Sequence, residues 1–501
     1  MELRRKIAHN TAIQTIGKIL GTGLSLIAAG IVFRLLGDEG FGKYTSIMGF
    51  LQIFGTLMDF GLYIILVKRY SDSSEKSSPV VNTIFTLRVL SGIVFLGSAP
   101  LIAICINLFN PIYSAHLIFG MLLALGFFFF ISLNQLLSVI FQKQLQSQRI
   151  AIGELVGKVV LLSATALVAW LHYGLYAVLL TMVLSSGVNC AILFFSARKY
   201  VHLRLHLDRS LVKEIFHETW PIAISIVFVQ LYFKGDIVFL TLFHTSESAI
   251  GWYGAPYKIL EVLVTFPAMF VGLVLPVATK AWQQKDLPRF QDVVQKSFDA
   301  LILVAVPMVA GTLALAPQMM QVLAGADFNN STTVLRILII ASGAIFIATL
   351  FGYLVVAIDR QRFMTWGYGF VAVSSLLLYA IMIPRFSIIG AAWVTVYSEI
   401  SVACITTWMV LRATHIHLRC MTLCKSAVAA CAMYTVLWFV LPAGSRVLHS
   451  LTSGFSASVQ AGLQLSLFIP LGVVVYGVVI VAIRGLRVQE IRALLSAKSN
   501  G

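Results

Sequence analysis

The sequence contains few acidic residues and few cysteines, and it lacks the short motifs that mark common enzyme classes. Its 501 residues include 20 Asp and Glu against 36 Lys and Arg, with six scattered cysteines. Such spacing indicates neither a disulfide framework nor a redox pair. The phosphate-binding loop GxxxxGK followed by Ser or Thr does not occur, and neither do GxSxG and HExxH. We therefore predict no ATP hydrolysis, no catalytic residues, no cofactor and no enzyme activity.

The chain also lacks any long hydrophilic stretch that could form a soluble domain. Hydrophobic residues make up 59% of the chain and charged residues 11%, and the mean hydropathy is +0.91. Apolar runs of about 20 residues, the length that crosses a bilayer as a helix, recur along the whole sequence. The runs do not alternate as barrel strands do, so helices must satisfy the backbone in lipid. The sequence therefore predicts an all-α, polytopic membrane protein.

The distribution of positive charge predicts the topology. We expect about fourteen spans, near residues 10–36, 44–67, 80–106, 115–141, 150–171, 174–197, 219–243, 251–279, 294–316, 332–358, 363–383, 388–411, 423–441 and 461–483. With the N-terminus inside, 26 of the 36 Lys and Arg fall in inner segments and four in outer connections. This asymmetry predicts that both termini are cytoplasmic. The net charge of +16 then reflects topology rather than a nucleic-acid surface. Because Lys18 interrupts the first apolar run, we expect an uncleaved helix rather than a signal peptide.

A basic stretch at 198–218 is expected to be a cytoplasmic surface helix that links two six-span halves. The expected division is 1–197, 198–218, 219–411 and 412–501, the last part holding two extra helices and a cytoplasmic tail. A weak echo relates the halves: GDEGFGKY (37–44) and ESAIGWYGAPYK (247–258) join corresponding spans. Transporters are often built from such repeats, with the binding site where the repeats meet.

Six basic residues lie inside apolar spans, and we call them the intramembrane bases: Lys18, Arg88, Lys158, Lys234, Lys258 and Arg336. A cation at membrane depth is costly, so it normally faces water, a partner charge or a substrate. Several share a helix face with other polar residues, as Lys18 does with Thr22 and Ser25. Such faces predict a water-filled cavity or a buried interface. The excess of positive charge suggests an anionic ligand.

Internal ion pairing is the alternative reading of these residues. Glu154 precedes Lys158 by one helical turn, and Lys258 precedes Glu261 by three residues. Four acids are deep enough to matter, Glu154, Asp236, Glu261 and Glu399, so six bases leave positive charge over. Arg336, near an outer span end, can reach water by extending its side chain. Asp59 and Asp299 are read as helix-terminal residues. We take Asp236, Glu261 and Glu399 as candidates for proton or cation coupling.

A second group of polar residues lies beside the membrane. His415, His417, Cys420 and Cys424 have the spacing HxHxxCxxxC. That spacing matches no standard zinc pattern, and interfacial side chains explain it equally well, so we predict no metal site.

Four stretches, taken in order, resemble a known family. They are RLLGDEGFGKYTSIMGFLQIFGTLMDFGL (34–62), DIVFLTLFHTSESAIGWYGAPYKILE (236–261), LAGADFNNSTTVLRILIIA (323–341) and GAAWVTVYSEI (390–400). Together they are similar to bacterial polysaccharide flippases of the O-antigen type, in the multidrug/oligosaccharidyl-lipid/polysaccharide exporter superfamily. The resemblance covers residues 10 to about 411. It implies two six-helix lobes in a V around a central cavity, and places Lys18, Arg88, Lys234 and Lys258 at basic cavity positions.

The function implied by the resemblance is transport of a polyprenyl-diphosphate-linked oligosaccharide from the cytoplasmic to the outer leaflet of the bacterial inner membrane. Membrane lipids, a polysaccharide polymerase and glycosyltransferases are the expected partners, and nucleic acid is not one. A lipid II-type flippase and a multidrug exporter of the same fold are alternatives, although the basic excess disfavours cationic drugs. A membrane glycan polymerase or ligase is the alternative from another class. Such enzymes usually carry a long external loop, whereas the longest candidate (442–460) offers only Arg446 and His449.

Overall fold

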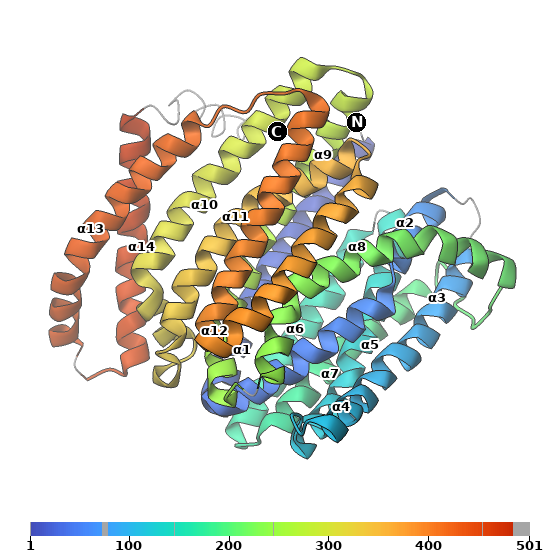
Figure 1. The fold of residues 1–501 in the computed structure, drawn as a ribbon, viewed down its shortest axis with the longest axis horizontal. Coiled ribbons are helices and arrows are strands. Elements are labelled where there is room, and N and C mark those ends of the chain that lie inside the picture. Colours follow the sequence, from blue (N-terminus) through green and yellow to red (C-terminus); the bar gives the residue numbers. More distant parts are fainter. Residues whose placement is uncertain (1, 73–78, 145, 244, 453, 484–501) are drawn as a thin grey trace. The chain divides into compact units, whose positions relative to one another are not determined.

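Helices make up most of the part of the chain that the computed structural model describes. These residues are 2–72, 79–144, 146–243, 245–452 and 454–483, without the side chains of 2–15, 71, 72, 221, 222, 447, 449 and 451. No strand occurs among them. The predicted cytoplasmic tail, with Arg484, Arg487, Arg492 and Lys498, lies outside the described residues. The expectation of an all-α fold is confirmed (Figure 1).

The helices follow the predicted spans closely. They are α1 (Glu2–Asp59), α2 (Leu62–Asp72), α3 (Pro79–Ser91), a π-helical turn (Gly92–Leu96), α4 (Gly97–Phe109), α5 (Ala115–Lys143), α6 (Ser147–Trp170), α7 (Leu175–Ala197), α8 (Arg209–Leu242), α9 (Glu247–Gln283), α10 (Leu287–Leu323), a 3₁₀ turn (Ala326–Phe328), α11 (Ser331–Ala357), α12 (Gln361–Thr414), α13 (Met421–Leu451) and α14 (Ala457–Ala482).

Twelve stretches are long and apolar enough to cross a membrane, and two of them have room for two crossings each. Ile16–Tyr70 has 55 residues and Gln361–Thr414 has 54. The first bends at Gly37, whose φ of 64° suits a residue without Cβ, and the second bends at Ser387, with φ 49°. A crossing on each side of both bends agrees with about fourteen spans.

The predicted linker helix is only partly helical. After α7 ends at Ala197, residues 201–208 run without regular structure, and α8 begins at Arg209. Asp208 caps this helix, since its Oδ1 accepts the backbone N–H of Ser210 at 2.9 Å. The helix then continues without a break into the span at Ala223–Leu242.

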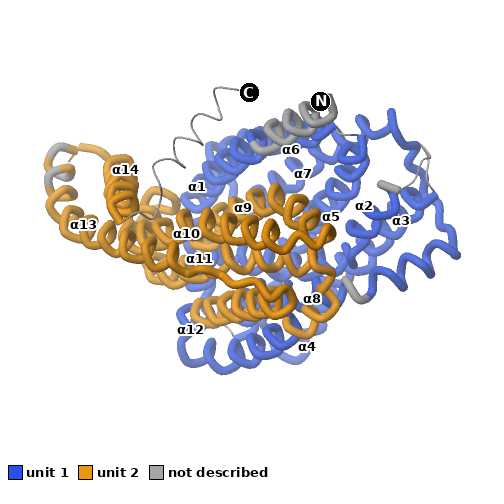
Figure 2. Tube along the Cα trace, turned by 90° about the horizontal axis from the view of Figure 1, so that it is seen from above, with its two compact units in different colours: residues 1–254, 368–391 blue, residues 255–367, 392–501 orange. Residues whose placement is uncertain are grey.

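The chain forms two compact units, coloured separately in Figure 2. Unit 1 comprises residues 1–254 and 368–391, and unit 2 comprises 255–367 and 392–501. Both α9 and α12 therefore contribute to both units. These borders differ from 1–197 and 219–411, and the six-helix lobes stay a prediction.

Each unit has its own apolar core. In unit 1, buried side chains such as Tyr70, Phe141 and Ile215 join α2, α5 and the start of α8. In unit 2, α13 and α14 lie side by side against α10 (Figure 1), and Met433 and Phe468 are buried among them. The hydroxyls of Ser426 and Tyr476 form a 2.7 Å hydrogen bond within this second core. The two C-terminal helices are thus packed parts of unit 2.

Candidate functional site

Two intramembrane bases gather around one carboxylate in unit 1. Helices α1 and α6 pack closely, since a Cβ at Gly17 would lie only 3.1 Å from Cβ of Ala151, and Lys158 lies next to Gly21. The Glu154 carboxylate interacts electrostatically with both Lys18 and Lys158. Lys18 is exposed, while Glu154 and Lys158 are half-buried. We call these three side chains the basic group; they lie on two apolar spans and carry one net positive charge when all three are ionised.

Arg88 lies apart from that group in a buried ion pair. Its side chain is 0% exposed, and its Nη1 bonds Oδ1 of Asp59, which is 20% exposed. Among the described residues, its Nε and Nη2 have no hydrogen-bond partner. Asp59 also accepts the backbone N–H of Tyr63 at 3.3 Å, across a break where Phe60 and Gly61 have φ of 45° and 76°. Arg88 therefore helps to hold the break between α1 and α2, and this contact fits the ion-pair alternative.

Lys234 and Asp236 on α8 are both buried in unit 1. Lys234 is 3% exposed, and its Nζ lies 5.3 Å from the centroid of the Phe233 ring. Asp236 is 0% exposed, and its Oδ2 accepts a 2.6 Å hydrogen bond from the hydroxyl of Tyr253 on α9. Its Oδ1 accepts the backbone N–H of Ile237 at 2.7 Å. These bonds satisfy the carboxylate and fix its position between two helices.

Unit 2 holds the other two intramembrane bases. Lys258 forms a 3.0 Å ion pair with Glu261 one turn further along α9, and the two side chains are 33% and 39% exposed. Arg336 on α11 is exposed, and its Nε donates to the backbone carbonyl of Leu313 at 3.2 Å. Lys258 therefore has the ion pair that the alternative reading expects. Arg336 is exposed and bonded to the backbone, which fits its predicted place near the end of a span.

Glu399 on α12 is a buried carboxyl in unit 2. It is 4% exposed, and its Oε1 has no hydrogen-bond partner among the described residues. Buried polar atoms are nearly always satisfied, so an unsatisfied one calls for an explanation such as an exchangeable proton or ion. Among the three ion-coupling candidates, Glu399 is the one that the described residues leave least satisfied.

The two echoing connections of the sequence contact each other within unit 1. A Cβ on Gly42 would overlap the backbone carbonyl oxygen of Glu247, and a Cβ on Gly251 would overlap that of Asp38. A Cβ on Gly254 would collide with the side chain of Thr45. We call this contact, between residues 38–49 and 237–254, the glycine clasp. Its reciprocal form arises because each connection places a glycine against the other's backbone.

Polar contacts supplement the glycine clasp. Lys43 bridges Glu39 at 2.7 Å and Glu247 at 3.1 Å, so it joins the two connections. Deeper along the helices, Thr241 donates a 3.2 Å hydrogen bond to Ser46. Short side chains let helices approach closely in a membrane, where such contacts replace the hydrophobic drive.

The sequence reasoning missed three of these features. The sequence analysis assigns Asp59 to a helix end, yet Asp59 and Arg88 lie at similar depths, about eight residues from the inner ends of consecutive spans, and that shared depth is the signal for pairing. Nothing in the sequence pairs Tyr253 with Asp236, which lies 17 residues earlier on another helix. The echo at 37–44 and 247–258 was noted as a repeat, and nothing in it indicated direct contact. Among the residues that the structure describes, no three His, Cys, Asp or Glu side chains converge as metal ligands.

Comparisons with known proteins place this arrangement in a family. Residues 7–282 match the family described as polysaccharide biosynthesis protein. A probable low-salt glycan biosynthesis flippase of Haloferax volcanii is 23% identical over 410 residues, covering 78% of this chain and 81% of the relative. The lipopolysaccharide biosynthesis protein WzxC of Escherichia coli is 23% identical over 344 residues, covering 68% and 67%.

Solved structures share the fold. The lipid II flippase MurJ, in an inward closed conformation, has a TM-score of 0.72 at 14% identity and covers 93% of this chain and 98% of its own. An inward-facing multidrug resistance MATE transporter of the MOP superfamily has a TM-score of 0.64 at 13% identity, covering 81% and 98%. These likenesses support the predicted all-helical transporter fold.

Proposed function

The chain belongs to the polysaccharide biosynthesis protein family, and we propose that it is a flippase for polyprenyl-diphosphate-linked oligosaccharide. The substrate would move from the cytoplasmic to the outer leaflet of a bacterial inner membrane, with both termini of the protein cytoplasmic. The observation that carries this proposal is the basic group of Lys18, Glu154 and Lys158. Its net positive charge lies on two apolar spans, where a bound anion would compensate for the hydration that a cation loses.

A diphosphate is the anion that such a group suits. Hydrogen bonds from ammonium groups to phosphate oxygens are short and about twice as strong as neutral ones. Fixed cations would therefore lower the barrier for a headgroup that cannot enter hydrocarbon bare, while the polyprenyl tail stays in lipid. Lys234 would supply a further contact when transport exposes it, and Arg88, Lys258 and Arg336 remain weaker candidates because of their local partners.

Alternating access gives the glycine clasp a role. One side of the clasp comes from the first predicted lobe and the other from the second, at connections that the predicted topology puts outside. We propose that it seals the outer end of the pathway and must separate for release. Asp236, Glu261 and Glu399 would couple that cycle to protons or cations, with the unsatisfied Glu399 oxygen favouring that residue.

The first test uses cells that lack their own flippase and receive Lys18→Ala or Lys158→Ala. We expect a loss of surface polysaccharide with unchanged amounts of membrane-inserted protein. Lys280→Ala is the matched control, since it removes an exposed lysine at the end of α9. Normal polysaccharide in a Lys18→Ala, Lys158→Ala double variant would refute the role of the basic group.

The alternatives give different outcomes in vesicles. A lipid II-type flippase would move lipid-linked cell-wall precursor, and a multidrug exporter would move a cationic dye. A polymerase or ligase would lengthen or transfer the glycan in purified membranes. Dependence on a polymerase and glycosyltransferases in the cell would support the expected partners.

A further inference from the structure

The segment between α7 and the membrane-spanning part of α8 is fastened to unit 1 at several points. We call residues 198–220 the linker strap. The backbone N–H of Arg204 donates to Oδ1 of Asn82 at 3.1 Å, and that of His206 donates to Oγ1 of Thr86 at 2.9 Å. Both acceptors lie on α3. The strap is therefore held in a defined place rather than left as a loose connection.

One side of the strap is part of the core. Val201 and Ile215 are each 1% exposed and belong to the apolar core of unit 1, with Leu203 and Leu211 packed beside them. Its opposite side is exposed and still apolar in part. Leu205 is 70% exposed, Phe216 59% and Trp220 47%. The strap therefore buries one apolar side in unit 1 and leaves a second apolar side exposed.

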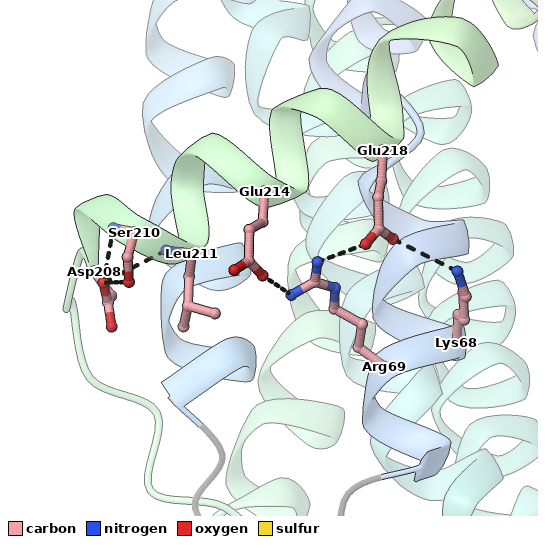
Figure 3. Close-up of polar contacts among 7 residues, drawn as sticks. All are labelled: Lys68, Arg69, Asp208, Ser210, Leu211, Glu214 and Glu218. Atoms are coloured by element: carbon pink, nitrogen blue, oxygen red, sulfur yellow. Dashed lines mark hydrogen bonds and ion pairs between the residues drawn. The ribbon is translucent and has the colours of Figure 1, made fainter.

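The acidic residues of the strap are engaged within unit 1. Figure 3 shows Glu214 and Glu218 on α8 reaching Arg69 on α2, at 3.0 Å and 2.6 Å. Glu218 also lies 3.7 Å from Lys68. Asp208 accepts the Ser210 hydroxyl at 2.6 Å. The carboxylates of the strap are thus occupied by α2 and by the cap of α8.

Four basic residues of the strap have no such partner among the residues that the structure describes. Lys199, Arg204, Arg209 and Lys213 are all exposed, and within the described ranges no carboxylate lies at ion-pair distance from any of them. Their charges are therefore exposed. On α8, Arg209, Lys213, Phe216 and Trp220 follow steps of three or four residues and so share one exposed helix face.

The strap is tied to the membrane at both ends. It follows the span that ends at Ala197 and leads into the span that begins at Ala223. Exposed apolar and aromatic side chains among cations are typical of segments that lie in the interface of an anionic membrane. A nucleic acid would leave the exposed leucine and aromatic side chains uncovered.

We propose that the linker strap binds the headgroups of anionic phospholipids in the adjacent leaflet, which is the cytoplasmic one under the predicted topology. The cations would contact phosphates while Leu205, Phe216 and Trp220 enter the acyl boundary. Because the strap is bonded to α2 and α3, binding of anionic lipid to the strap would also affect the packing of these helices in unit 1.

The test uses the full chain in vesicles of synthetic phosphatidylcholine with or without phosphatidylglycerol, free of any lipid-linked sugar. Trp220 reports the contact, as the fluorescence difference between the protein and its Trp220→Phe variant. We expect brominated phosphatidylglycerol to quench this difference signal at about fivefold lower mole fraction than brominated phosphatidylcholine. High salt should remove the preference, since exposed charges are screened.

The charge variant combines Arg204→Gln, Arg209→Gln and Lys213→Gln, and it should lose the preference. A matched control combines Lys280→Gln, Lys285→Gln and Arg289→Gln in the next basic segment and should keep it. Equal quenching by both lipids in the unaltered protein would overturn the proposal. A lipid preference that persists in high salt would also overturn the proposal. That measurement uses the unaltered protein, so it does not depend on whether a variant folds.

Discussion

The glycine clasp joins α1 to α8 and α9, and the linker strap joins α2 and α3 to the start of α8, yet the two contacts rest on different physics. The clasp brings backbone against backbone at Gly42 and Gly251, where no Cβ fits. The strap's contact with α2 consists of partly exposed ion pairs of Arg69, which is 19% exposed, with Glu214 and Glu218, which are 61% and 33% exposed. A close backbone contact has no room for added atoms, but its stability does not depend on salt or pH. An exposed ion pair can be substituted with little steric cost, but its stability depends on both salt and pH.

The largest expected effect comes from the buried ion pair beside the strap, where Phe60 stacks on Phe216 with ring centroids 5.5 Å apart. Asp59→Asn leaves the fully buried Arg88 without its counter-charge. We expect a loss of about 3–5 kcal/mol in the free energy of unfolding, measured by thermal unfolding in detergent. Adding Arg88→Met should recover most of it. Unchanged stability in Asp59→Asn would show that this pair is not what holds the break.

The next effect tests the clasp as a steric contact. Gly251→Ala places a methyl group against the Asp38 carbonyl, and such overpacking costs about 1–3 kcal/mol. If the clasp must form in each cycle, flipping should fall roughly ten- to a hundredfold in a vesicle assay. Gly272→Ala on the same helix is the control, since nothing lies within 4 Å of its added Cβ. Full flipping by Gly251→Ala would refute closure through this contact.

A smaller effect is expected from the ionic part of the clasp. Lys43 and Glu247 are 30% and 34% exposed, so their coupling should be about 0.2–1 kcal/mol in a double-mutant cycle of Lys43→Met and Glu247→Gln. The coupling should shrink in high salt. A coupling energy larger than the loss of stability caused by Gly251→Ala would mean that charge, rather than close packing, dominates the clasp.

The smallest effect concerns acid sensitivity of the strap. The Arg69 guanidinium beside Glu218 holds the pKa of that carboxyl below its usual 4.5. A lowered folded-state pKa contributes stability that is present above 4.5 and lost as the pH falls through the lowered value. Glu218→Gln should therefore lower the melting temperature by a degree or so at pH 7, with the difference from the parent vanishing in strong acid. A difference that grows in acid would reverse the assigned sign.

Hydropathy alone was sufficient for the fold class and for about fourteen crossings, because lipid demands long uninterrupted apolar helices. The glycines of GDEGFGKY indicate a break between two spans, where the structure has the bend at Gly37. The basic group is predicted in part, since the spacing of Glu154 and Lys158 places them one turn apart. The acidic partner of Arg88 could not be predicted from spacing, because Asp59 lies 29 residues away on another helix.

By itself, the sequence determined that this protein spans a membrane, which family it resembles, and where costly charges enter apolar helices. Those properties are local or compositional, and each follows from the free energy of moving a residue into lipid. Only the tertiary structure decided which charges meet. It buried Arg88 against Asp59, bonded Asp236 to Tyr253, and brought Gly42 and Gly251 against distant backbone. Such pairings depend on how whole helices pack, which no single segment specifies.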